Sequence, residues 1–134
     1  MEYFLTEEQQ MLKDLARKIA EERVVPVRAE LDEKEEFPWE IMHTCSDAGL
    51  FGVFIPEEYG GFGGGVLDNC LVVEELSKAC IGISTSFASS GLGAYPILLH
   101  GTEEQKKQYH TVPPPDSQRQ TTGRLWRYRG QCRQ

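Results

Sequence analysis

The sequence lacks the marks of a membrane or secreted protein. No apolar run approaches the about 18 residues that a membrane-spanning helix needs. The start, Met1-Glu-Tyr-Phe, is not the basic segment of a signal peptide. The four cysteines show no C-x-x-C spacing, so neither a redox pair nor a zinc site is indicated. We therefore expect a cytoplasmic chain with no membrane span and with free, mostly buried thiols in a reducing compartment.

Metal-ligating patterns and an excess of positive charge are also missing. His43, His100 and His110 stand on separate elements with no carboxylate at ligand spacing, so no metal site is expected. The 14 Lys and Arg residues are outnumbered by 21 Asp and Glu, which gives a net charge of −7. That charge argues against nucleic acid or an anionic membrane as the main partner.

What is present is the composition of one ordinary globular domain. A chain of 134 residues, 40% hydrophobic and 10% aromatic, can bury a core without disulfides. The charge is uneven along it, however. Residues 1–109 hold 9 basic and 20 acidic side chains, whereas residues 110–134 hold 5 Arg and one Asp. The chain therefore divides into an acidic part and a basic one.

Apolar residues in the acidic part recur at three- and four-residue intervals, which predicts helices. The capping-box pattern Thr6-Glu-Glu-Gln starts the first helix, and the same pattern recurs at Thr102. We expect an all-α domain of about six helices. They are predicted from Thr6 to Pro26, Val27 to about Glu35, Pro38 to Gly49, about Val66 to Ala79, about Ile83 to Leu99, and Thr102 to Tyr109.

The same periodicity predicts which side chains face the core. The first helix is expected to bury Met11, Leu12, Leu15, Ile19 and Ala20, and the fourth to bury Leu67, Cys70, Leu71, Val73, Leu76 and Ala79. Cys45, Cys70 and Cys80 are accordingly expected to be inert core thiols. The glycine-rich run from Gly60 to Gly65 is interpreted as a turn rather than a phosphate loop, because it lacks the Lys-Ser/Thr that follows such loops.

Residues 110–134 follow neither the helical nor the strand period, and Pro113-Pro114-Pro115 breaks regular structure. We therefore predict a helical domain over 1–109 and a basic tail over 110–134 that is disordered or the product of a frameshift. An alternative is a nucleic-acid-binding arm, in which Trp126 and Tyr128 stack on bases. We favour the frameshift.

Three segments follow one another in a characteristic order and spacing. They are Leu5-Thr6-Glu7-Glu8-Gln9; then Gly49-Leu50-Phe51-Gly52, Ile55-Pro56-Glu57-Glu58-Tyr59-Gly60-Gly61 and Val73-Glu74-Glu75-Leu76-Ser77; then Leu92-Gly93-Ala94-Tyr95-Pro96-Ile97 and Gly101-Thr102-Glu103-Glu104-Gln105-Lys106-Lys107. With these, residues 3–109 resemble the N-terminal domain of the acyl-CoA dehydrogenase family. The resemblance implies the first third of a longer flavoenzyme, followed by a middle β-barrel domain and a C-terminal four-helix bundle.

The resemblance also implies a reaction, a cofactor and partners. Family members bind FAD, abstract an α-proton from an acyl-CoA with a glutamate, and pass a β-hydride to the flavin. Their electrons typically go to an electron-transfer flavoprotein, and a full-length parent is expected to be a homo-oligomer. The domains that bind FAD and supply the glutamate are absent from this sequence. No catalytic or cofactor-binding residue is assigned here, and the chain alone is expected to be inactive.

One part of the substrate site is implied to lie within this domain. The small-residue helix of the family supplies a wall of the acyl pocket, and the matching positions here are Ser84, Thr85, Ala88 and Leu92. Small side chains there leave room for an acyl chain. The alternative is that these are helix residues satisfied by packing or by a carbonyl one turn back.

At this point in the chain, members of the family have a flavin-contacting motif, and the tail can be compared with it. Read one nucleotide later, its codons can spell Ala-Ala-Phe-Gly-Val-Thr-Glu-x-Asn-Ala-Gly, similar to the flavin-contacting motif of the family. Trp126, for example, has only the codon TGG and gives Gly in the shifted frame. We therefore expect the sequence from near His110 onward to be a frameshift product of a truncated gene.

A different class of function stays open. The chain is alternatively a non-catalytic helical module that binds acyl groups or a partner protein. In either case the fourth and fifth helices are expected to carry exposed apolar patches when the domain stands alone.

Overall fold

The computed structural model describes residues 4–110 of the chain, with side chains through residue 106, and every regular element in that range is helical. This confirms the all-α prediction. The elements, in order, are α1 Glu7–Ile19, η1 Ala20–Val24, α2 Arg28–Lys34, α3 Trp39–Asp47, η2 Leu50–Gly52, η3 Glu57–Tyr59, α4 Val66–Ala79, α5 Ile81–His100 and α6 Glu103–His110. The tail after residue 110, with its predicted disorder and frameshift, lies outside the described residues.

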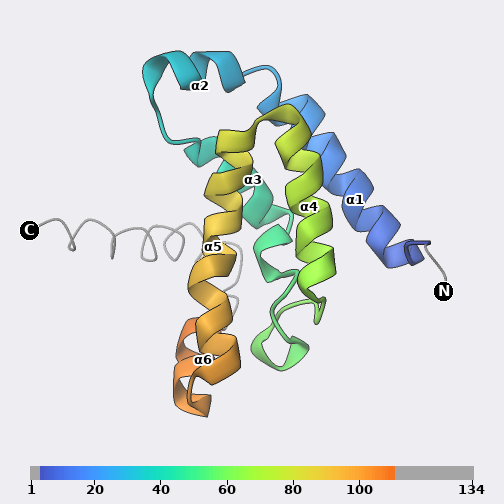
Figure 1. The fold of residues 1–134 in the computed structure, drawn as a ribbon, viewed down its shortest axis with the longest axis vertical. Helices are drawn as coiled ribbons and strands as arrows, with labels where there is room; N and C mark the ends of the chain where they lie inside the picture. Colours follow the sequence, from blue (N-terminus) through green and yellow to red (C-terminus); the bar gives the residue numbers. More distant parts are fainter. Residues whose placement is uncertain (1–3, 111–134) are drawn as a thin grey trace, which may run out of the picture.

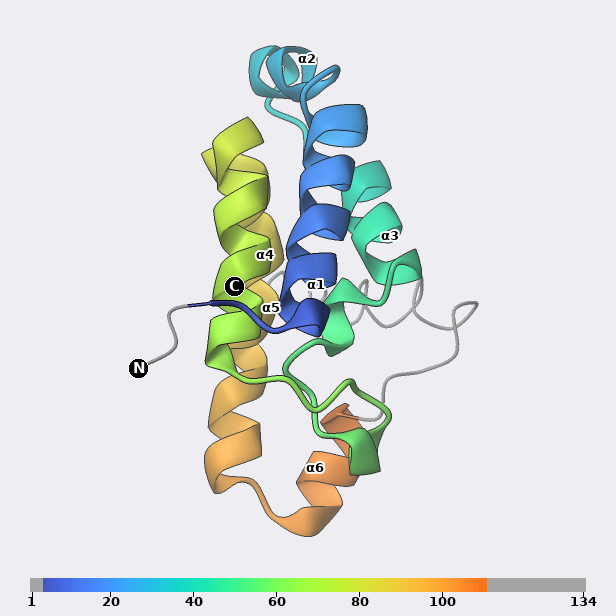
Figure 2. The same cartoon turned by 90° about the vertical axis from the view of Figure 1, so that its right-hand side faces the viewer.

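The three long helices α1, α4 and α5 lie side by side, with α4 in the middle (Figure 1). Helix α3 packs behind them, α2 lies at one end, and α6 folds back at the other (Figure 2). Among the described helices, none is both long enough and apolar enough to cross a membrane. The main core lies between α1, α3, α4 and the first half of α5. It consists of Ala16, Ile19, Ala20, Val24, Ile41, Met42, Cys45, Leu50, Val53, Val72, Leu76, Ala79, Ile83 and Phe87.

Both predicted capping boxes are present. The Thr6 hydroxyl accepts a hydrogen bond from the backbone N–H of Gln9 at 3.2 Å, and the Gln9 side chain accepts one from the N–H of Thr6 at 3.2 Å. Thr102 and Gln105 make the same pair of bonds at 3.3 and 2.9 Å. Since these bonds satisfy backbone N–H groups that a helix start leaves unpaired, they set where α1 and α6 begin.

The first helix departs from its prediction in part. Ile19 and Ala20 are buried as expected, but Met11 is 66% exposed and Leu15 is exposed as well, and Ala16 is buried in addition. The reason is that α4 packs on the side of α1 that carries small Ala16, which allows the two backbones to approach. Past Ile19 the chain continues as one π-helical turn, in which Val25 donates its N–H to the Ala20 carbonyl at 3.0 Å.

The fourth helix also departs from its prediction in part, although Leu71, Leu76 and Ala79 are buried as expected. Its buried stripe consists of Leu71, Val72, Glu75, Leu76 and Ala79. Leu67 and Cys70 are exposed, so the expectation of a buried Cys70 was wrong. Periodicity alone could not decide which side of α4 is buried, because apolar residues lie on both sides of the helix. The side that is buried also includes a carboxylate, that of Glu75.

The glycine-rich segment is a tightly hydrogen-bonded turn. Every backbone N–H from Gly60 to Gly64 donates to a carbonyl of residues 52–57, at 2.8 to 3.2 Å. The N–H of Gly65 donates to the Asp68 carboxylate at 2.7 Å, which also caps α4. All six N–H groups are therefore engaged, so none is left to cradle a phosphate.

A second, smaller cluster joins this turn to the end of α5. Phe54, Ile55 and Tyr59 pack against Ala94, Tyr95 and Leu98. The Tyr59 hydroxyl donates a 2.8 Å hydrogen bond to Glu103 of α6. That bond, with burial, raises the pKa of Tyr59 to about 12. Helix α5 thus spans two packed regions, the main core at its start and this cluster at its end.

Gly61 should be the least replaceable residue of the turn. A Cβ there would lie 2.1 Å from the Ile55 carbonyl oxygen. We expect Gly61→Ala to lower the free energy of unfolding by about 3 kcal/mol, measured by urea denaturation. Gly82→Ala is the matched control, because its Cβ would meet only Cys80 Sγ at 3.9 Å. That change should be neutral or stabilising by up to about 1 kcal/mol. Equal losses in the two variants would contradict the packing described here.

Candidate functional site

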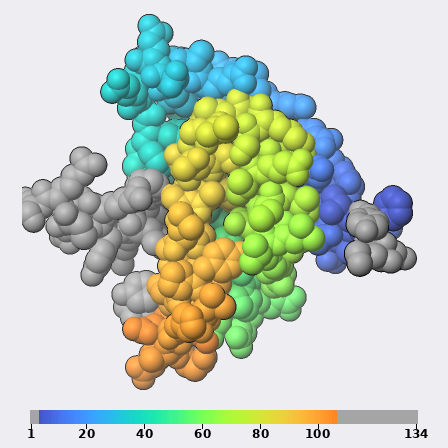
Figure 3. Space-filling model, in the orientation of Figure 1, coloured from blue at the N-terminus to red at the C-terminus, as the bar shows by residue number. Residues whose placement is uncertain are grey.

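Helix α5 follows α4 after a single extended residue, Cys80, so the two helices run antiparallel in contact. Small residues hold them together. The Ser77 hydroxyl donates to Ser84 at 2.9 Å, and the Ser84 hydroxyl donates to the Val73 carbonyl at 2.9 Å. Farther along, Gly91 is buried against α4. Together α4 and α5 form a large part of one face of the molecule (Figure 3).

The four residues predicted to form the pocket wall lie along one side of α5, as their three- and four-residue spacing requires. Their exposure differs, however. Ser84 is buried and bonded to α4, Ala88 is half-buried, and Thr85 and Leu92 are exposed. Ser84 therefore anchors the helix, whereas Thr85 and Leu92 present their side chains outward and Ala88 lies half-buried on the same side.

The outward side of α5 is apolar for a surface. Leu92 is 77% exposed, and Ile81 and Leu99 are exposed to a similar degree. Val66 and Leu67, at the start of α4, are exposed as well. Apolar patches on these two helices were expected from the sequence. Such patches mark surfaces that contact another protein segment or a ligand.

Among the described residues, one charged side chain is buried, that of Glu75. The sequence analysis did not single it out. It lies on α4, is 2% exposed, and faces α1. The guanidinium of Arg17 donates two hydrogen bonds to its carboxylate at 3.2 and 3.3 Å. Lys78 lies 2.8 Å away and Lys13 3.6 Å. One signal could have found it, since Glu75 falls four residues after Leu71 and four before Ala79, in the middle of the buried stripe.

Arg17 and Lys78 decide the ionisation of Glu75. Burial alone would raise its pKa, but hydrogen bonds and charge from Arg17 and Lys78 outweigh burial and lower the pKa to about 2. A carboxylate with that pKa stays ionised at neutral pH and has little tendency to take up a proton. Glu75 is therefore a structural anion between α1 and α4, unsuited to act as a general base.

Other reactive groups do not converge. Burial raises the pKa of the Cys45 thiol to about 12, which makes it inert. Cys80 is half-buried and Cys70 exposed, and all three are free thiols. Within residues 4–106, no group of three or more His, Cys, Asp or Glu side chains is placed to hold a metal ion.

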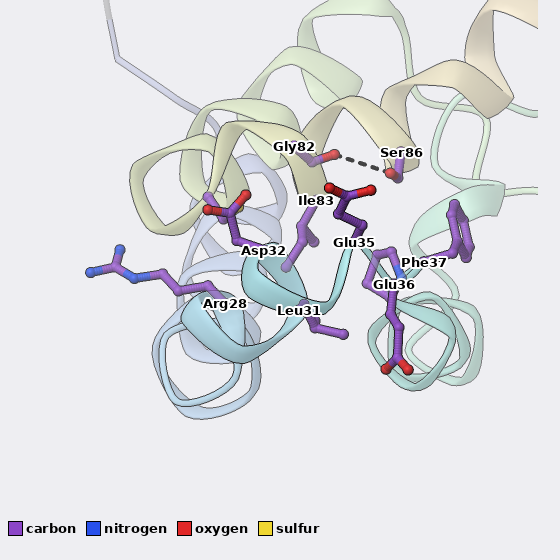
Figure 4. Close-up of a pocket in the computed structure, with 11 residues that line it drawn as sticks. Arg28, Leu31, Asp32, Glu35, Glu36, Phe37, Gly82, Ile83 and Ser86 are labelled. Carbon is purple, nitrogen blue, oxygen red and sulfur yellow. Dashed lines mark hydrogen bonds between the residues drawn. The ribbon is translucent and has the colours of Figure 1, made fainter.

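A pocket of about 390 Å³ lies between α2 and the start of α5 (Figure 4). Three acidic residues line it, Asp32, Glu35 and Glu36, together with Ser86 and Arg28. Arg28 donates a 2.6 Å hydrogen bond to the Ala79 carbonyl and Ser86 one of 3.0 Å to the Gly82 carbonyl. The predicted wall residues do not line this pocket.

The described residues do not fit FAD. A flavin dinucleotide needs N–H groups or cations for its pyrophosphate, and the N–H groups of the glycine-rich turn are all engaged. Three of the basic side chains on α1 and α4, Lys13, Arg17 and Lys78, are paired with Glu75.

Comparison with known proteins points to one family. The model of the acyl-CoA dehydrogenase N-terminal domain matches residues 6–111. Among curated relatives, a short-chain-specific acyl-CoA dehydrogenase of Clostridium acetobutylicum is 44% identical over 111 residues, covering 81% of this chain and 29% of the relative. The chain spans less than a third of the length of the first curated relatives it matches.

Solved structures agree. Butyryl-CoA dehydrogenase from Megasphaera elsdenii matches with a TM-score of 0.77 and 34% identity, covering 87% of this chain and 31% of that one. A chain in the structure of the electron transferring flavoprotein of Acidaminococcus fermentans matches with a TM-score of 0.78 and 40% identity, covering 88% and 31%.

Glu75 should make folding stability depend on pH. Because its pKa in the folded chain, about 2, is below the usual 4.5, its stabilisation is complete above pH 4.5 and is lost as pH falls towards 2. We expect Glu75→Gln to lower the free energy of unfolding by about 3 kcal/mol at pH 7. The difference from the unsubstituted chain should shrink between pH 4.5 and 2, measured by urea denaturation at each pH.

Glu74→Gln is the matched control. Glu74 binds the same Lys78 at 3.1 Å, but its side chain is 52% exposed. Its loss should cost less than about 1 kcal/mol at any pH. A Glu75→Gln effect that stays constant from pH 7 to pH 2 would show that the carboxylate charge is not what stabilises the fold.

Proposed function

This chain belongs to the acyl-CoA dehydrogenase family, and we propose that it is the N-terminal helical domain of a flavin-dependent acyl-CoA dehydrogenase. The parent enzyme would remove hydrogen from the Cα–Cβ bond of an acyl-CoA, with FAD as hydride acceptor. The observation that carries the proposal is the family match over residues 6–111, supported by the fold shared with butyryl-CoA dehydrogenase. By this proposal the domain boundary lies at residue 109, and FAD is held by parts of the parent outside this chain.

The domain's role is to supply one wall of the acyl pocket. Ala88 and Thr85 are small and lie on the outward side of α5, with Leu92 one turn after Ala88. An acyl chain lying along this side would contact methyl groups over two helical turns. Ser84 contributes indirectly, because its hydrogen bonds fix α5 against α4. Substrate contact at these four positions is part of the proposal.

The substrate is proposed to be a short acyl-CoA. A relative that is 44% identical is named as short-chain specific, and a structural neighbour is a butyryl-CoA dehydrogenase. An electron-transfer flavoprotein is the proposed electron acceptor, and the match to a chain in such a structure supports it. Homo-oligomer formation by the parent and a cytoplasmic location complete the proposal, and the free thiols of Cys45, Cys70 and Cys80 fit a reducing compartment.

The basic tail is proposed to be a frameshift product, because the codons that its residues permit can spell the family motif in a shifted frame. The nucleotide sequence through and beyond residue 134 decides this, because the shifted frame must continue into a middle domain. A stop codon or an unrelated sequence in that frame would remove the support for it.

A second candidate is a helical module that binds a partner protein or acyl groups without catalysis. The exposed apolar side chains of Ile81, Leu92 and Leu99 favour it. A helix of a partner protein could bury them just as effectively as a neighbouring domain of the same enzyme. The two candidates differ in whether the domain supports flavin chemistry once joined to the rest of an enzyme.

Domain exchange separates the two candidates. We expect the 134-residue chain alone to retain no flavin and to turn over no butyryl-CoA. Residues 1–109, placed before the remaining domains of the C. acetobutylicum relative, should give a yellow protein that passes electrons from butyryl-CoA to an electron-accepting dye. A chimera that folds, by circular dichroism, and binds FAD but shows no turnover would favour the non-catalytic module.

Ala88 tests the pocket wall within that chimera. Ala88→Leu adds bulk on the outward side of α5, so it should raise the KM for hexanoyl-CoA at least about tenfold more than that for butyryl-CoA. Ser86→Leu is the matched control, since Ser86 faces the pocket beside α2. Equal changes for the two substrates, or the same selectivity in both variants, would place the acyl chain elsewhere.

A further inference from the structure

The pocket between α2 and the start of α5 combines an apolar floor with an acidic rim. Leu31, Phe37 and Ile83 line it with apolar side chains, and Asp32 and Glu35 line it with carboxylates. In Figure 4 these two carboxylates lie on either side of Ile83. Its volume of about 390 Å³ is in the range of pockets that bind small ligands, so it has room for a few side chains of another segment.

Helix α2, which forms one side of this pocket, is weakly supported by the rest of the domain. It has seven residues, and none of them is fully buried. Leu31 packs against the main core but is only partly buried. Helices shorter than about 12 residues are marginal on their own and depend on packing for their stability. A segment lying in the pocket would cover more of Leu31 and so add to that packing.

The charge around α2 favours a basic occupant. Residues 28–40 hold six acidic and two basic side chains. Both basic side chains are already engaged within the domain. Lys34 pairs with Glu30 at 2.6 Å, and Arg28 donates a 2.6 Å hydrogen bond to the Ala79 carbonyl. The acidic excess at this end of the molecule is therefore not neutralised locally.

The carboxylates of the rim belong to this excess. Within residues 4–106, no basic side chain forms an ion pair with Asp32 or Glu35. Their negative potential would repel an anionic ligand and attract a segment that carries Lys or Arg. The apolar floor adds a second requirement, because it is covered best by an apolar side chain of the same segment.

We propose that the pocket between α2 and α5 is a docking site for a basic segment of a partner protein, in which an apolar side chain stands between two Arg or Lys residues. In an extended segment, side chains two residues apart point to the same side. The pattern Arg-x-Leu-x-Arg therefore places Leu on the floor beside Ile83 and one Arg toward each of Asp32 and Glu35. The proposal does not rest on the dehydrogenase function, because none of the predicted acyl-wall residues lines this pocket.

A peptide titration of the 134-residue chain tests the proposal. The probe is acetyl-Arg-Ser-Leu-Ser-Arg-amide, followed by the backbone amide chemical shifts of the protein in nuclear magnetic resonance. We expect saturable shifts at Ile83 and Ser86. Acetyl-Arg-Ser-Ser-Ser-Arg-amide should bind at least about fivefold more weakly, because it has no side chain for the apolar floor. Acetyl-Glu-Ser-Leu-Ser-Glu-amide should give no saturable shift, because the rim repels it.

Charge reversal at the rim tests which residues bind the peptide. At about 0.15 M salt, Asp32→Lys should weaken binding of the first peptide at least about tenfold. Glu33→Lys is the matched control, since it makes the same change of charge at the next residue of α2, which does not line the pocket. It should weaken binding less than about twofold. Circular dichroism checks that both variants fold. Equal weakening in the two would mean a general attraction between a basic peptide and an acidic chain, and would overturn the proposal.

Two other occupants of the pocket would show themselves in the same titration. If the shifts appear only after Arg124, Arg127 and Arg129 are replaced by Gln, the basic tail of this chain occupies the pocket. If a fluorescently labelled peptide binds the 134-residue chain but not the chimera with the C. acetobutylicum domains, a neighbouring domain of the enzyme covers it. Either result, or the absence of any saturable shift, would contradict docking of a separate partner. Binding to both proteins is the expected result, whether or not the chimera turns over butyryl-CoA.

Discussion

The position of the central helix depends on one buried carboxylate. Glu75 of α4 is held by Arg17, Lys13 and Lys78 at the α1–α4 contact. Removing a carboxylate from water is costly, and it is tolerated only when cations and hydrogen bonds replace the lost hydration. Because the bidentate Arg17 geometry fits one arrangement of the two helices, Glu75 specifies register where Ala16, Val72 and Leu76 supply apolar packing.

The position of α5 follows from that of α4. One extended residue separates the two helices, and the Ser77–Ser84–Val73 hydrogen bonds hold the Ser84 side of α5 against α4. The side that carries Ala88 and Leu92 therefore faces outward as a consequence of internal packing. The end of α5 is fixed independently, by the cluster of Phe54, Ile55 and Tyr59. A surface held rigidly at both ends suits a helix whose proposed task is to bound a substrate.

The sequence predicted helix starts well and buried faces less well. Thr6-Glu-Glu-Gln and Thr102-Glu-Glu-Gln located α1 and α6, because a capping box is local chemistry. The observed α5 begins two residues before its prediction and ends one later. The buried stripes of α1 and α4 were partly wrong, since Met11, Leu67 and Cys70 are exposed. Glu75 and Ala16 are buried at the α1–α4 contact instead, because the carboxylate of Glu75 pairs with cations and the small Ala16 lets the helices approach. Such a fit between two helices cannot be predicted from the periodicity of one helix alone. The candidate wall on α5 came from family resemblance, and the structure adds which of its residues point outward.

The most direct measurement is the distance between α5 and a bound acyl chain. It can be taken from a crystal structure of residues 1–109 joined to the remaining domains of the C. acetobutylicum relative, with butyryl-CoA bound. The account predicts carbon atoms of the acyl group within about 4 Å of Ala88 or Leu92, with Ser84 still bonded to Val73. An acyl chain that lies away from the outward side of α5 would contradict it.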